Sequence, residues 1–178
     1  DCLLSRGLGD VYKRQAYEYK DVYVSLLAYL GNVAARIGAK YSIPAPTVIN
    51  LDGYPDLAKL PEGDLIFVSD WTLTSDGNVY GDYHQMLLGF SVVNDPNLMK
   101  METKYMNELM LDIARRKPCP SRIDIMKENG TEQVGVLVFS EDYETMSPKV
   151  TNSRVFKSVL VNMLSPQRLL AETDGANG

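Results

Sequence analysis

Residues 65–93 read LIFVSDWTLTSDGNVYGDYHQMLLGFSVV, and this stretch decides the fold. Apolar and polar side chains alternate on both sides of a short polar link, which is the pattern of two half-buried β-strands. The link Ser75-Asp76-Gly77-Asn78 contains Asp-Gly, a pair that supplies the positive φ angles of a tight hairpin turn. The sequence therefore predicts a β-hairpin with strands over residues 65–74 and 79–93.

The alternation also predicts which side chains share a face of each strand. The larger apolar side chains of the first strand fall in one phase: Leu65, Phe67, Trp71 and Leu73. The second strand has Met86, Leu88, Phe90 and Val92 in one phase and Tyr83, Gln85 and Leu87 in the other. His84, the only histidine, is in phase with Met86. We expect His84 to be structural, because a lone histidine lacks the partners of a catalytic triad or a metal site.

Working outward from the hairpin, the chain predicts two helices and a second strand pair. Apolar residues recur at steps of three or four over residues 19–38 and from Pro96 to about residue 116. Asp95 can cap the second helix, and Pro96 suits its first position. The closing strands are expected over residues 133–144 and 154–164, with no internal repeat.

This order predicts an α+β fold, α-β-β-α-β-β, with one mainly antiparallel or mixed sheet and two helices packed on one face. We expect a single domain over residues 16–165 and a flexible tail over residues 166–178. Prolines make residues 41–63 a Pro-rich insertion of mostly irregular structure, with room for a short strand at residues 47–51.

Composition argues against several classes of function. The net charge is −5 and no block of basic residues occurs, which argues against nonspecific nucleic-acid binding. The sequence contains no uninterrupted run of about 18 apolar residues, so it predicts no membrane-spanning helix. The two cysteines, Cys2 and Cys119, lack the spacing of a zinc site, although a disulfide between them is possible on count.

Catalytic motifs are not recognisable, so we expect a protein that is not an enzyme and that uses no cofactor or metal. Glycine-rich phosphate loops are absent from the sequence. Carboxylates on or near strands leave a metal-dependent nuclease open as the less favoured alternative, and they can equally be solvated edge charges. Clustering of Asp70, Asp82 and Glu141 or Asp142 around one pocket would support the nuclease.

Three aromatic residues of the hairpin are candidate protein-interface anchors: Trp71, Tyr80 and Tyr83. Tyrosine and tryptophan on exposed strands are enriched where proteins bind one another. Burial inside the sheet is the alternative explanation for the same residues. The expected role is binding to other proteins.

In element order and strand texture, residues 17–165 resemble the tail terminator proteins of long-tailed bacteriophages. The resemblance is carried by the helix at residues 19–38, by the hairpin strands Leu65-Ile66-Phe67-Val68-Ser69-Asp70-Trp71 and Met86-Leu87-Leu88-Gly89-Phe90-Ser91-Val92, and by the helix after Asn94-Asp95-Pro96. It implies a hexameric ring that caps the tail tube and meets the head connector, in the tail or neck of a virion assembled in the host cytoplasm. Another phage neck or head-completion protein, or a generic protein-interaction module, is the alternative.

The first fifteen residues differ in character from the rest of the chain. The segment Ser5-Arg6-Gly7-Leu8-Gly9-Asp10-Val11-Tyr12-Lys13-Arg14-Gln15 resembles translated sequencing adapter, as seen in metagenomic gene predictions. Residues 1–15 are therefore expected to be an artefact or a disordered arm, and they play no part in the fold argument.

Overall fold

The computed structural model describes residues 18–75, 82–93, 95, 101–113, 122–151 and 153–165. These residues form helices α2 (Tyr19–Tyr41) and α3 (Met101–Ile113) and strands β1 (Thr47–Asn50), β2 (Leu65–Ser75), β3 (Asp82–Val93), β4 (Arg122–Met126), β5 (Gln133–Thr145), β6 (Lys149–Val150) and β7 (Arg154–Ser165). Two short 3-10 helices, η2 (Leu51–Gly53) and η3 (Leu57–Lys59), follow β1.

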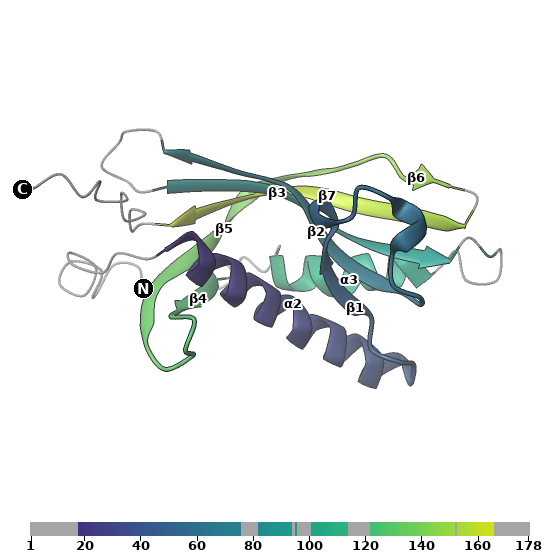
Figure 1. Cartoon of the computed structure of the whole chain (residues 1–178), viewed down its shortest axis with the longest axis horizontal. Helices are drawn as coiled ribbons and strands as arrows, with labels where there is room; N and C mark the ends of the chain where they lie inside the picture. Colours follow the sequence, from purple (N-terminus) through teal and green to yellow (C-terminus); the bar gives the residue numbers. More distant parts are fainter. Residues whose placement is uncertain are drawn as a thin grey trace, which may run out of the picture.

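The strands form one curled, mixed sheet, so the predicted α+β class is confirmed (Figure 1). The sheet order is β1-β2-β3-β7-β5-β4, and β6 pairs with the start of β7. β1 runs parallel to β2, whereas the other pairs are antiparallel. β2 and β3 pair as the predicted hairpin, and its turn at residues 76–81 lies outside the described residues.

The predicted element order omitted the short strands β4 and β6 and counted β1 only as an option. β4 has five residues and β6 has two, which is too short for a local pattern to stand out. They form strands because the longer β5 and β7 offer backbone partners to them. Tertiary pairing therefore decides these two elements, in line with the strong context dependence of strand formation.

Helix α2 begins and ends at identifiable caps. Glu18 and Asp21 form a reciprocal capping box, in which Asp21 accepts the backbone N–H of Glu18 at 2.9 Å. The helix continues three residues past the expected stop at Gly38, because Ser42 takes the left-handed conformation with φ 53°. Gly38 instead lies close to the backbone of Ala45, at 3.1 Å from where a Cβ would sit.

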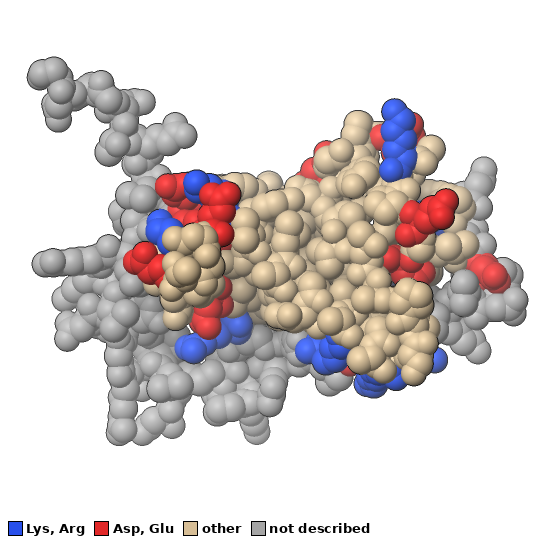
Figure 2. Space-filling model, turned by 60° about the horizontal axis from the view of Figure 1, so that its bottom comes forward, with Lys and Arg blue, Asp and Glu red and all other residues tan. Residues whose placement is uncertain are grey.

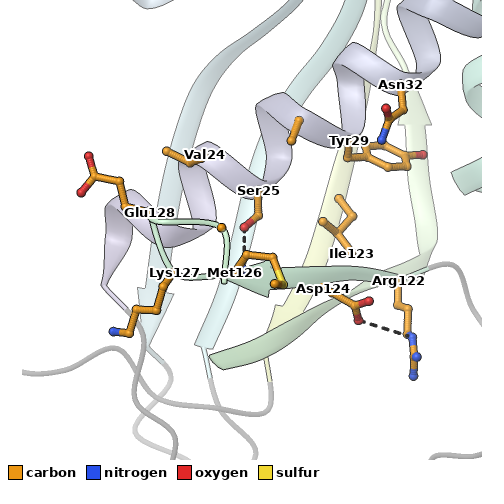
Figure 3. Close-up of a pocket in the computed structure, with 12 residues that line it drawn as sticks. Val24, Ser25, Tyr29, Asn32, Arg122, Ile123, Asp124, Met126, Lys127 and Glu128 are labelled. Carbon is orange, nitrogen blue, oxygen red and sulfur yellow. Dashed lines mark hydrogen bonds and ion pairs between the residues drawn. The ribbon is translucent and has the colours of Figure 1, made fainter. Parts of the chain in front are cut away.

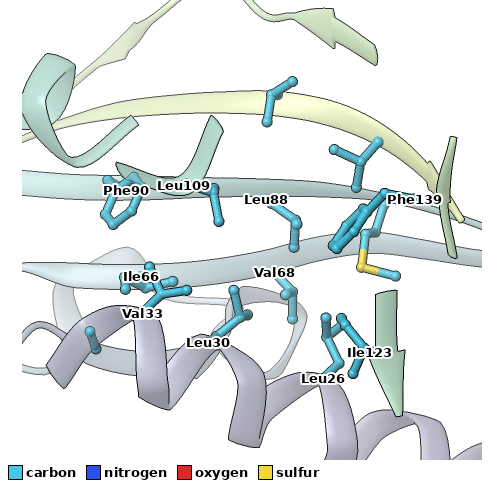
Figure 4. Packing of buried hydrophobic residues seen from close by; sticks show 14 of the residues in the cluster. Leu26, Leu30, Val33, Ile66, Val68, Leu88, Phe90, Leu109, Ile123 and Phe139 are labelled. Carbon is cyan, nitrogen blue, oxygen red and sulfur yellow. The ribbon is translucent and has the colours of Figure 1, made fainter. Parts of the chain in front are cut away.

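The main core lies between α2, α3 and one face of the sheet, which we call the inner face (Figure 4). Each helix contributes its apolar stripe, and the strands contribute alternate residues, as the 3.6 and 2.0 periodicities require. Buried members of the cluster include Leu26, Leu30 and Val33 of α2, Tyr105 and Leu109 of α3, and Ile66, Val68, Met86, Leu88, Phe90 and Phe139 of the sheet.

A β-bulge overturns the predicted phase of β2. The register shifts between Ser69 and Thr72, and Asp70 sits there with φ 52°. Leu65 and Phe67 therefore lie on the opposite face, which we call the outer face, in a second small cluster with Phe156. Trp71, four residues after Phe67, packs against the main core instead. The strict alternation assumed from the sequence is broken by the one extra residue.

The Pro-rich segment is held to the sheet by a buried arginine. Arg154, at the start of β7, donates from Nη1 to the carbonyl oxygen of Gly63 at 2.9 Å and from Nη2 to that of Pro61. The Nη1 group also lies 3.4 Å from Ser91 Oγ. Because the guanidinium presents fixed donors, one side chain can bind two carbonyl groups of this connection.

Length and composition alone would allow α2 to cross a membrane, with a mean hydropathy of 1.3 over its best window. A search for an uninterrupted apolar run misses this, because polar residues interrupt the helix. In the structure α2 is the long core helix: the nine buried residues among its 23 form the stripe that faces the sheet. Core helices of this kind pass the same hydropathy test.

Candidate protein-binding surfaces

The side of α2 that faces away from the sheet carries no charge along most of its length. No charged residue occurs between Asp21 and Arg36. The exposed positions there are Val24, Ala28, Asn32 and Ala35, with Leu27 and Gly31 half-buried beside them. Figure 2 shows this uncharged surface between charged groups that gather at both ends of the molecule. We call it the α2 surface.

A groove of about 360 Å³ runs beside the α2 surface, between α2 and the edge strand β4 (Figure 3). Val24, Ala28, Tyr29 and Asn32 line one wall and Ile123 and Met126 line the other. Ser25 Oγ accepts the backbone N–H of Met126 at 2.8 Å, so it fixes β4 to the helix. The groove is therefore a mostly apolar extension of the α2 surface.

Charged groups close the groove at its ends. The buried carboxylate of Asp21 accepts the backbone N–H of Glu128 at 3.2 Å and lies 3.5 Å from Lys127 Nζ. At the other end Arg122 Nε lies 3.7 Å from Asp124 Oδ1. An apolar centre with a charged rim is the usual anatomy of a protein interface.

Part of the outer face of the sheet, on the opposite side of the molecule, is a second uncharged surface, which the exposed Glu144 of β5 borders through its pairing with Leu160. Cross-strand pairing places Tyr83 beside Leu164, Gln85 beside Asn162 and Leu87 beside Leu160. Gln85 Nε2 donates to Asn162 Oδ1 at 2.9 Å, which satisfies the central polar pair. Leu87, Leu160 and Leu164 remain half-buried, and Gln85 is exposed. We call these six residues the outer-face surface.

The three aromatic residues predicted as interface anchors are not brought together. Tyr83 is 39% exposed on the outer face. Trp71 points to the inner face, where the centroids of its ring and of the Tyr19 ring are 4.9 Å apart. Its Nε1 donates to Nδ1 of the buried His84 at 3.2 Å. Tyr80 lies outside the described residues. The bulge at Asp70 explains why Trp71 and Tyr83 face opposite ways.

The carboxylates that would support a nuclease are only partly described. Asp70 is exposed at the bulge, and its backbone N–H donates to Asp52 Oδ1 at 3.1 Å. The side chains of Asp82, Glu141 and Asp142 lie outside the described residues. Among the residues that the structure does describe, no group of three or more His, Cys, Asp or Glu side chains could hold a metal ion.

Sequence reasoning missed the α2 surface, although a signal for it was available. The periodicity predicts the apolar stripe that faces the sheet. The absence of charged residues from the opposite side of the helix was the missed signal. An exposed helix face normally carries charged residues, whereas here alanine, glycine and valine occupy it. A helical-wheel plot of residues 19–41 would have indicated a second uncharged side.

Comparison with known proteins gives no assignment. No protein family, curated protein sequence or solved structure matches the chain.

Proposed function

We propose that this protein is a structural assembly protein without catalytic activity, which acts as a closed ring of identical subunits. In the manner of the phage tail terminators that its element order resembles, the ring caps a tail tube and joins it to the head connector. The observation that carries the proposal is the pair of uncharged surfaces, on α2 and on the outer face of the sheet. In the proposed arrangement both helices cover the inner face and leave the outer face to a partner.

Two different surfaces on opposite sides of a subunit favour head-to-tail association. A two-fold dimer uses the same patch on both partners, whereas a ring needs one patch to meet a different patch on the next subunit. The α2 surface and the outer-face surface differ in shape and lie on opposite sides. We propose that the α2 surface of one subunit packs on the outer-face surface of the next.

The two surfaces also match in length. The uncharged stretch of α2, residues 22–35, is about 21 Å long at 1.5 Å per residue. The outer-face surface spans residues 83–87 of β3 and 160–164 of β7, which is about 17 Å at the usual rise of a strand. One helix can therefore lie along the central strands, and uncharged side chains on both sides avoid the desolvation of charges.

Native mass spectrometry of the full chain tests the ring directly, with Ala28→Glu as the disrupting variant. A glutamate at this exposed position would bury an unpaired charge in the interface, so each contact should weaken by more than tenfold. Ala58→Glu is the matched control, because Ala58 is exposed on η3 and belongs to neither surface. We expect six subunits for the wild type and the control, and monomers for Ala28→Glu.

Other outcomes would redirect the assignment. A ring of twelve subunits would favour a head-completion protein, and a wild-type monomer would favour a generic interaction module. If the isolated chain is monomeric, the mass should be measured again with purified tail-tube protein of a long-tailed phage. A chain that stays monomeric and leaves tube ends uncapped in electron micrographs contradicts the terminator proposal.

A further inference from the structure

A second cavity, of about 300 Å³, lies at one end of the outer face. Its floor is formed by β2, β3 and β7, through residues such as Phe67, Leu87 and Ser158. The segment after β1 forms one wall with Leu57 and Asp52, and the segment around β6 forms the other. We call this cavity the outer-face pocket. Its volume suits a small molecule or a single long side chain.

A buried hydroxyl, that of Ser69, lines this pocket, and Ser69 is only 6% exposed. Its backbone pairs with Leu87 in the sheet, but its Oγ makes no hydrogen bond within the described part of the chain. Buried polar groups are nearly always hydrogen-bonded, so an unpaired one calls for a ligand or a function.

Two carboxylates are held at the rim beside Ser69. Asp70 sits in the left-handed region at φ 52°, and the Asp52 carboxylate secures it by accepting its backbone N–H. Within the described residues neither Asp52 nor Asp70 takes part in an ion pair. Strained backbone that is kept by its surroundings tends to occur at functional sites. The rim therefore offers two carboxylates that no described cation pairs with directly.

The floor of the pocket is kept flat by Gly89. A Cβ at this position would lie 2.3 Å from the carbonyl oxygen of Lys157, 2.7 Å from Phe67 Cζ and 2.8 Å from Ser158 Cβ. Glycine thus lets the Phe67 ring cross the sheet next to Phe156, with ring centroids 5.9 Å apart. The resulting floor is apolar and suits an aliphatic chain.

From this arrangement we propose that the outer-face pocket binds a guanidinium group carried on an aliphatic stem, as in arginine. The planar guanidinium presents five N–H donors, which match the two rim carboxylates and the Ser69 hydroxyl as acceptors. The stem lies over Phe67 and Leu87. Lys149 on the far wall is separated from β2 by β3 and β7, so it leaves the rim charge to the ligand. Leu87 also belongs to the outer-face surface, so the pocket borders the contact proposed for the ring, but ligand binding can be measured without a ring.

Isothermal titration calorimetry of the full chain tests the proposal with free arginine and with acetyl-Gly-Arg-Gly-amide. Citrulline is the neutral control ligand, because it keeps the shape of arginine and loses the charge. Binding of free arginine identifies a small-molecule site, and binding of the peptide alone identifies a site for a side chain of a partner protein. Either result supports the pocket. No heat from either ligand, or equal binding of citrulline, overturns it.

Three variants locate the binding and separate it from folding. Asp52→Asn and Asp70→Asn should each weaken arginine binding by about tenfold, since a charge-assisted hydrogen bond is lost. Asparagine can still accept at position 52 and tolerates positive φ at position 70, so the fold is retained. Ser69→Ala should weaken binding without lowering the unfolding midpoint, because its hydroxyl has no hydrogen-bond partner among the described residues. Asp56→Asn is the control, and binding that survives all three pocket variants excludes this site.

Discussion

At the scale of single residues, Asp70 decides where the neighbouring side chains of β2 point. Its left-handed backbone and the extra residue of the bulge place Phe67 on the outer face and Trp71 on the inner face. The Asp52 carboxylate holds this conformation through the Asp70 N–H. Aspartate is among the few non-glycine residues that enter this region readily.

A β-branched residue at this position should therefore destabilise the fold. We expect Asp70→Val to lower the free energy of unfolding by about 1–3 kcal/mol, because valine is strained at positive φ. Asp70→Asn should stay within about 0.5 kcal/mol of the wild type. Urea unfolding followed by circular dichroism measures both. Equal stability of the valine variant would mean that the bulge is not strained.

Replacement by alanine should change the free energy of unfolding in opposite directions at Gly89 and at Gly31. Gly89→Ala should lower the free energy of unfolding by about 1–3 kcal/mol, because the new Cβ meets the backbone of Lys157, which cannot move away freely. Gly31 has nothing within 4 Å of a built Cβ and lies inside α2. Gly31→Ala should raise stability by about 0.5–1 kcal/mol. Thermal or urea unfolding of both variants checks the pair, and a shared direction would contradict it.

At the scale of elements, α2 and α3 are joined by a buried carboxylate. Glu108 of α3 accepts hydrogen bonds from Lys40 and from Tyr41 Oη, the latter at 3.2 Å. The hydrogen bond from Lys40 lowers the pKa of the Glu108 carboxyl, and nearby Arg36 acts in the same direction. In the same layer Tyr105 Oη donates to Asp64 Oδ2 at 2.6 Å, and burial raises the pKa of this phenol.

The Glu108 contact should make stability depend on pH in the acidic range. A carboxyl whose pKa is lowered by folding stabilises the protein above its unfolded pKa, about 4.3, and this contribution disappears as the pH falls through the lower folded value. We expect Glu108→Gln to be less stable than the wild type at pH 7 and to approach it near pH 3. Glu132→Gln, at an exposed site, is the control. Parallel curves of unfolding midpoint against pH for wild type and Glu108→Gln would contradict the assignment.

Elements with a strong local signal were predictable, and those that depend on distant partners were not. The hairpin strands and α2 follow from alternation, helical periodicity and the Asp-Gly turn pair. β4 was missed because its five residues form a strand only through pairing with β5, which comes later in the chain. The orientation of Trp71 was wrong because the bulge has no unambiguous sequence signature. The outer-face pocket was missed because Asp52 and Ser69 meet only after β1 and β2 have paired.

At the scale of the whole molecule, head-to-tail assembly makes a prediction that a two-fold dimer does not. Ala28→Glu alters the α2 surface and leaves the outer-face surface intact, whereas Gln85→Glu does the reverse. Each variant alone should be monomeric. Because each keeps one good surface, an equimolar mixture should form one-to-one dimers and no larger ring. Native mass spectrometry resolves this outcome, and monomers in the mixture would argue against heterologous contacts.

The position of β7 has a consequence for how the protein is made. β7 is the last described strand along the chain, yet it lies between β3 and β5 in the middle of the sheet. While the ribosome is still synthesising residues 154–165, the nascent chain can form β2–β3 and β4–β5 only as separate halves. Each half then has an unpaired edge, which is where strands of other chains attach. Synthesis of residues 154–165, more than formation of the early hairpin, sets the moment at which this protein closes its sheet.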